Sequence, residues 1–242
     1  MAELELLAIA LTAMLASALT LLSGFGLGTL LMPVVALFFP VEVAVAVTAL
    51  VHLANNAYKF VVLGAGADWS LVRRFGIPAV LLAFPGAWLL THAAAVPTRQ
   101  LIGALILLFV LLELLPVVKR LKFPAHWMPL GGALSGFFGG LSGHQGAFRS
   151  LFLLKSHISK EQFIATNIVI ALLVDVARLG VYGWRAPTLQ IDWLLAAIAT
   201  LAAFAGVNIG RRFIHKVTID SIQKLVAVLL SVIGVGMMCG IL

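Results

Sequence analysis

Long apolar stretches constrain the fold of this chain more than any other feature. Six of them reach the length of about 20 residues that a helix needs to cross the hydrocarbon core of a bilayer. They cover residues 41–63, 70–92, 98–118, 160–183, 192–214 and 220–242. Because only helices and closed barrels satisfy their backbone hydrogen bonds in lipid, stretches of this length predict an all-α polytopic membrane protein.

The composition supports this class and excludes others. Hydrophobic residues make up 62% of the 242 residues and charged residues 10%, whereas soluble domains carry about 25% charged residues. The net charge of +7 lies mostly in short gaps between apolar stretches, as in cytoplasmic loops, so a nucleic-acid partner is not expected. The single cysteine, Cys239, permits no intramolecular disulfide, and neither a metal site nor a cofactor is predicted.

Two further apolar stretches are interrupted by glycines. Residues 5–39 are too long for one span and contain the sequence Ser-Gly-Phe-Gly-Leu-Gly at 23–28. Residues 129–154 contain glycines at 131, 132, 136, 139, 140, 143 and 146. We expect the helix to be broken in both stretches, because glycine is unfavourable inside helices and lets the backbone leave them.

The two halves of the chain resemble each other. The matches are Gly24 and Gly28 with Gly139 and Gly143 at a shift of 115 residues, and Asp68-Trp69 with Asp192-Trp193 at a shift of 124. Their shared order predicts two repeats, residues 1–122 and 123–242. Each repeat would be a glycine-broken helical hairpin followed by three transmembrane helices.

Polar residues mark several helix starts. Ser159 followed by Gln162 matches a capping box, in which each side chain bonds the other residue's backbone N–H. Asp68 and Asp192 can each cap a helix, and the tryptophan after each suits the membrane interface. These signals predict helices that begin at about residues 69, 160 and 193.

The loop lysines and arginines predict the orientation. If each glycine-broken segment crosses the membrane once, these residues divide evenly between the two sides. If each segment enters and returns, eleven lie on one side and only Arg99 and Arg185 on the other. That positive-inside bias favours the second arrangement. The loops at 119–126 and 211–219 are then cytoplasmic, both termini lie outside, and the two repeats are inverted.

Ionisable side chains in apolar helices are costly and therefore informative. One helical face carries Thr48, His52, Asn56 and Lys59, and a shift of 119 residues gives Asn167, Ala171, Asp175 and Arg178. Asn55 and Thr166 flank these faces. We interpret the two faces as the lining of a cavity. For Lys59 and Arg178 two alternatives stay open: each could extend to the membrane surface, or Arg178 could simply pair with Asp175.

The second glycine-broken segment carries further polar residues. His144, Gln145 and Arg149 follow its glycines and precede an apolar run. Unwound backbone exposes N–H groups, and a guanidinium can bind an anionic oxygen in a bidentate manner. This combination favours an anion site. The alternative is that residues 144–149 form a surface loop.

These motifs resemble the TauE/SafE sulfite exporter family, also called the toluenesulfonate uptake permease family. The resemblance rests on the sequence GFGLGTLLMP at 24–33, GGLSG at 139–143 and Ala-Thr-Asn at 165–167. It implies a bacterial-type plasma-membrane carrier for sulfite, sulfonates or related sulfur anions. One departure is that Arg149 stands in the second half where Pro33 stands in the first.

We therefore expect a multi-pass cell-membrane protein that acts as a secondary transporter, in the exporting direction, for a small sulfur oxyanion. The predicted substrate contacts are Arg149, His144, Gln145, Thr48, Asn55, Asn56, Thr166, Asn167, Gly26 and Gly143. His52 and Asp175 are candidates for proton coupling, and Lys59 and Arg178 for a charge pair or gate. The alternatives are an anion channel, an intramembrane enzyme or a non-transporting membrane subunit.

Overall fold

The chain folds as an all-helical, multi-pass membrane protein. The computed structural model describes residues 3–23, 27–63, 66–92, 98–115, 123–153, 156, 158–184, 191–213 and 219–240. Within these ranges four helices are long and apolar enough to cross a membrane, at Val41–Val62, Trp69–His92, Glu161–Trp184 and Trp193–Arg212. The predicted all-α class is therefore confirmed.

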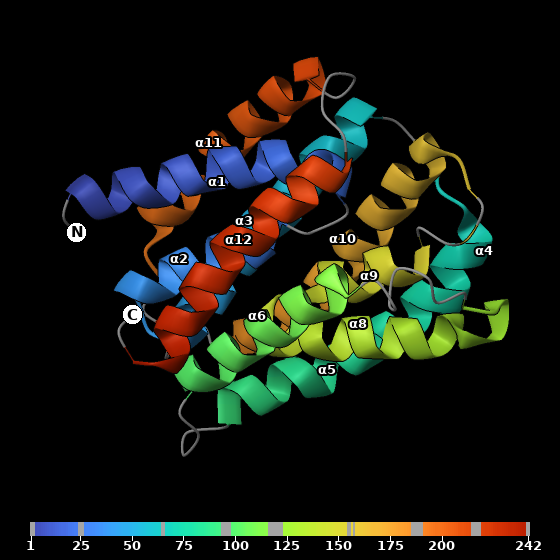
Figure 1. Ribbon diagram of the computed structural model, residues 1–242, viewed down its shortest axis with the longest axis horizontal. Coiled ribbons are helices and arrows are strands. Elements are labelled where there is room, and N and C mark those ends of the chain that lie inside the picture. The colour runs from blue at the N-terminus through green and yellow to red at the C-terminus, as the bar shows by residue number, and fades with distance from the viewer. Residues whose placement is uncertain are drawn as a thin grey trace.

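The described helices follow the predicted apolar stretches closely (Figure 1). In the first half they are α1 (Glu3–Ser23), α2 (Leu27–Phe38), α3 (Val41–Leu63), α4 (Trp69–Leu71), the π-helical turn η1 (Val72–Gly76), α5 (Ile77–His92) and α6 (Thr98–Leu114). In the second half they are the 3-10 turn η2 (Ala125–Trp127), α8 (Met128–Ser142), α9 (Gln145–Leu153), α10 (Lys160–Trp184), α11 (Trp193–Phe213) and α12 (Ile219–Met238).

The predicted helix caps are confirmed. Asp68 accepts hydrogen bonds from the first backbone N–H groups of α4 at 2.8 and 3.0 Å. Asp192 accepts one from the backbone N–H of Leu195 at 2.9 Å. Ser159 and Gln162 exchange two hydrogen bonds of 3.2 Å at the start of α10, which is the predicted capping box. The positions at which α4, α10 and α11 begin are thus determined locally by the sequence.

Helices of the two halves pack against one another in matching pairs. Helix α1 packs against α11, and α8 packs against α5. Helix α3 contacts α10, and α6 contacts α12. In Figure 1 α1 begins and α12 ends on the left of the molecule, whereas α4 and the start of α8 lie on the right. Contacts between the two halves therefore form most of the helix packing. The contact between α3 and α10 is one of them.

The break expected in residues 129–154 is present, but only one of the glycines makes it. Helix α8 runs without interruption through five of the glycines and ends only at Gly143. A Cβ atom added at Gly132, Gly136 or Gly140 would overlap the carbonyl oxygens of Phe75, Ala79 and Ala83 respectively. These glycines are thus spaced four residues apart on one face so that the backbones of α8 and α5 can touch, which is a common way of packing membrane helices.

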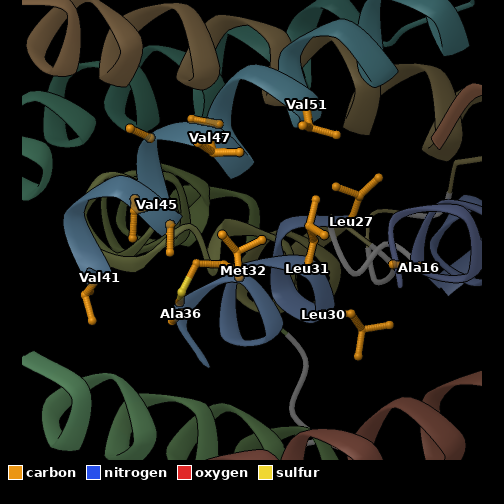
Figure 2. Close-up of a cluster of buried hydrophobic side chains, with 14 of the residues drawn as sticks. Ala16, Leu27, Leu30, Leu31, Met32, Ala36, Val41, Val45, Val47 and Val51 are labelled. Atoms are coloured by element: carbon orange, nitrogen blue, oxygen red, sulfur yellow. The ribbon is translucent and has the colours of Figure 1, made fainter. Parts of the chain in front are cut away.

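The short helix α2 is buried almost completely. Nine of its twelve residues are buried, as expected for a helix that is apolar on all sides. Figure 2 shows Leu27, Leu31 and Met32 of α2 in one apolar cluster with Val47 and Val51 of α3. At about 1.5 Å per residue α2 is too short to cross the bilayer. Its first turn, with Gly28, is buried inside the protein.

Candidate functional site

The first turn of α2 lies next to the break between α8 and α9. Gly143 has a left-handed backbone, with φ of 79°, and it separates α8 from α9. A Cβ atom at Gly28 would lie 3.4 Å from the carbonyl oxygen of Gly143 and 3.5 Å from the Cγ2 of Thr48. The start of α2, the end of α8 and the middle of α3 therefore meet at one point. Gly26 lies outside the described residues.

The polar faces of α3 and α10 also meet, at Asp175. The Nδ1 of His52 lies 2.6 Å from the Oδ2 of Asp175, and Asn56 donates to the same oxygen at 3.3 Å. Arg178 approaches the other oxygen, with Nε at 3.0 Å and Nη2 at 2.8 Å. Because a carboxylate only accepts hydrogen bonds, the hydrogen of His52 lies on Nδ1. All four side chains are buried.

Helix α9 adds an amide and a guanidinium to this network. Arg149 donates from Nε to Asn167 at 2.6 Å and from Nη1 to the amide oxygen of Gln145 at 3.1 Å. Gln145 in turn donates to Asp175 at 3.0 Å. Since Gln145 is fully buried and Arg149 is only 3% exposed, the alternative that residues 144–149 form a surface loop is wrong.

Arg178 holds the end of α8 in place. Its Nη1 donates to the carbonyl of Gly139 at 3.3 Å, and the hydroxyl of Tyr182 donates to the carbonyl of Gly140. The last carbonyls of a helix have no partner within it and attract positive charge. Arg178 is 0% exposed, so the alternative that it extends to the membrane surface is wrong.

Several buried polar atoms have no hydrogen-bond partner among the described residues. They are the hydroxyls of Thr29 and Thr48, the amide nitrogen of Asn55 and the Nε2 of His144. The Nδ1 of His144 lies 2.9 Å from the carbonyl of Ser142 and so carries the hydrogen, which makes Nε2 an acceptor. A buried polar group without a partner costs about 1–3 kcal/mol, so each of these atoms favours a polar ligand nearby.

Thr166 belongs to a different contact. Its hydroxyl accepts a hydrogen bond of 2.9 Å from the backbone N–H of Asp68, just before α4. Asn55 accepts one of 3.0 Å from Ser17 of α1. The structure therefore joins His52, Asn56, Gln145, Arg149, Asn167, Asp175 and Arg178 in one hydrogen-bonded network, and Thr166 and Asn55 make their described contacts outside it.

Three contributing residues were not identified from the sequence. Tyr182 lies four residues after Arg178 and seven after Asp175, so helical spacing could have indicated it. Ser17 had no such signal, nor did Ser135, which donates to the carbonyl of Gln145 at 2.8 Å. Their partners are distant in sequence or belong to the backbone.

Comparison with known proteins identifies the family. A family model described as "Sulfite exporter TauE/SafE" matches residues 9–237. The chain belongs to the TauE/SafE family. No curated protein and no solved structure shows a significant match. Membership places the chain in a family of membrane transporters for sulfite-type anions, and the resemblance of the glycine motifs is confirmed.

Buried charge in this TauE/SafE member is strongly unbalanced. Among the described residues, the buried cationic side chains are Lys59, Arg149 and Arg178, and Asp175 is the only buried carboxylate. Asp175 is paired with Arg178. The two contacts of Arg149 go to neutral amide oxygens, and Lys59 has no acceptor within the described part of the chain. Two buried cations therefore lack a carboxylate partner there.

Proposed function

We propose that this protein is a secondary transporter that exports a small sulfur oxyanion, such as sulfite or an organosulfonate, across the cell membrane. The observation that carries the proposal is the buried guanidinium of Arg149, which has only neutral partners among the described residues, together with the buried amine of Lys59, which is a cation when protonated. Burying an ion without a counter-charge costs several kcal/mol. An anion bound near these side chains would offset that cost, which supports an anionic substrate over a neutral or cationic one.

Arg149 is the leading contact in this proposal. Its guanidinium is held by Asn167 and Gln145 through two hydrogen bonds, and a guanidinium presents five N–H donors in a planar fork that suits oxyanions. Further contacts are proposed for other residues that the sequence singled out, which are Thr48, Asn55, Asn56, Thr166, Gly26 and Gly143.

The packing supports an inverted-repeat carrier. Each half contributes the first helix of its glycine-rich segment, α1 or α8, and each of these packs against the other half in the reciprocal pairs α1–α11 and α8–α5. Transporters built from inverted repeats bind substrate near the midplane, where interrupted helices meet. We propose repeats 1–122 and 123–242 that rock against each other about the network between α3 and α10.

Proton coupling is assigned to His52 and Asp175. The Nδ1 of His52 lies 2.6 Å from the Oδ2 of Asp175, and both residues are buried. Intramembrane His and Asp residues commonly serve as proton relays, and a histidine can change charge in the physiological pH range. In this proposal, protonation of the pair and occupancy of the anion site alternate during the transport cycle.

A transport screen in proteoliposomes tests the function. Purified protein would be offered sulfite, sulfate, thiosulfate, methanesulfonate and acetate, with empty liposomes as the control. The proposal expects saturable uptake of at least one sulfur oxyanion and its stimulation by a proton gradient. Uptake of none of them refutes the function. Non-saturable flux that follows only the membrane potential assigns the protein to the channel class instead.

Arg149 provides the sharper test. The substitution Arg149→Lys keeps the charge but loses the planar fork, so we expect transport to fall although the protein is made normally. Arg149→Ala should weaken anion binding by about 2–5 kcal/mol, as expected when one partner of a buried charge-assisted contact is removed. Arg73→Lys is the matched control because Arg73 is exposed. Normal affinity in Arg149→Ala would remove this residue from the site.

A further inference from the structure

Gln145 occupies a fixed position between the two functional parts of the network. It is the first residue of α9, directly after the break at Gly143 and His144. Its carbonyl accepts a hydrogen bond of 2.8 Å from Ser135, and its side chain is fully buried. A Cβ atom at Gly139 would lie 2.8 Å from the Cβ of Gln145, so α8 leaves this side chain little room to move.

The orientation of the Gln145 amide is determined by its partners. The NH₂ group donates to the Oδ1 of Asp175 at 3.0 Å, and the amide oxygen accepts from the Nη1 of Arg149 at 3.1 Å. A carboxylate can only accept and a guanidinium can only donate. Turning the amide over would therefore set donor against donor and acceptor against acceptor, and both hydrogen bonds would be lost.

The amide links the proposed anion contact to the carboxylate of the proton-coupling pair. The charged and titratable groups around Asp175 are His52 on α3, Arg149 on α9, and Arg178 and Tyr182 on α10. His52 and Arg178 contact the carboxylate directly. Arg149 makes no ion pair with it among the described contacts and reaches it through Gln145.

We propose that Gln145 is a positioning residue that couples anion binding at Arg149 to protonation at the His52–Asp175 pair, rather than a contact of the anion itself. This inference rests on the proposed transport function. When an anion draws Nη1 of Arg149 away, the amide oxygen loses its partner, and the amide is no longer held from both ends. Its NH₂ then holds the carboxylate less firmly, and the proton affinity of the pair changes. By linkage, protonation changes the affinity for the anion by the same factor.

The substitution Gln145→Met tests the coupling, because methionine has a similar length and neither donates nor accepts strongly. The measurement is the half-saturation concentration for sulfite uptake at about pH 6 and about pH 8, which spans the titration of histidine. Sulfite also titrates in solution, but that contribution is the same for every variant. The ratio of the half-saturation concentrations at the two pH values, compared between variants, therefore reports differences in the protein.

We expect the wild-type ratio to differ from that of His52→Gln by roughly five-fold or more, the usual lower range of coupling between sites. Gln145→Met should show the same ratio as His52→Gln. The double variant, which carries both substitutions, should show that ratio too. Gln100→Met, at an exposed position on α6, should keep the wild-type ratio.

A Gln145→Met protein that transports sulfite with the wild-type ratio would overturn the coupling role while leaving the transport function intact. Absence of uptake of every oxyanion in the transport screen by the wild type, in contrast, would refute the transport function and with it the basis of the coupling role. If Gln145→Met does not fold, Gln145→Asn provides the same test. It keeps the amide but is one methylene too short to bridge both partners, so it should lose the wild-type ratio as well.

Discussion

Substitution of Asp175 by asparagine should destabilise the protein more than any other isosteric change in the network. The carboxylate accepts hydrogen bonds from His52 and Asn56 at one oxygen and from Gln145 and Arg178 at the other. Asparagine retains one acceptor and replaces the other with a donor. The histidine can exchange its ring hydrogen between nitrogens to suit the new amide. The guanidinium of Arg178 cannot lose its charge.

The size of the expected loss of stability follows from the burial of Arg178. Its side chain is 0% exposed and Asp175 is its described counter-ion. Removing one partner of a buried ion pair costs about 3–5 kcal/mol, because the remaining charge stays desolvated. A typical protein has a total stability of about 5–15 kcal/mol. Asp175→Asn should therefore lower the amount of folded protein and its unfolding temperature in detergent.

The assay is thermal unfolding of purified protein, followed by the loss of the monodisperse peak in size-exclusion chromatography. Asp192→Asn is the matched control, since asparagine caps a helix about as well as aspartate and Asp192 is not buried. In an Arg178→Met background the cost of Asp175→Asn should largely disappear, because no uncompensated guanidinium remains. Wild-type stability of Asp175→Asn, together with transport that ignores a proton gradient, would refute the structural role and leave Asp175 with its proposed role in proton coupling alone.

Two further predictions concern packing and topology. Gly136→Ala should cost about 1–3 kcal/mol through overpacking against the α5 backbone, whereas Gly180→Ala, which faces open space, should be neutral or stabilising in the same unfolding assay. Single cysteines placed in the loops 119–126 and 211–219, on a Cys239→Ser background, should be labelled from the same, cytoplasmic side of the membrane. Labelling of these loops from opposite sides would contradict the inverted arrangement.

Helix positions were predictable because their signals are local. Apolar stretches of membrane-spanning length and the caps at Asp68, Ser159 and Asp192 each act within a few residues. Which glycine of residues 129–154 ends α8 could not be predicted, because a glycine that breaks a helix and a glycine that admits a neighbouring backbone look the same in sequence. Only the position of α5 decides between them, and that position is set by residues about 60 positions away.

The polar residues of α3 and α10 could be chosen from the sequence, because charge inside an apolar helix needs a reason. Their pairing could not. The shift of 119 residues aligned Asn56 with Asp175, yet the closest contact of the carboxylate on α3 is with His52, one turn earlier. How far one helix is displaced along another depends on packing between the two halves, which periodicity within each half does not determine.

Arg149 and Arg178 show how a shared residue type separates into two functions. Both are buried guanidinium groups near the end of α8. Arg178 is paired with Asp175 and donates a hydrogen bond to a carbonyl of α8. We therefore expect its loss to lower the stability of the protein. Arg149 contacts only neutral oxygens among its described partners, so its charge is available to a ligand. We therefore expect its loss to lower transport. A variant pair in which Arg149→Ala lowers stability and Arg178→Met lowers only transport would reverse this assignment.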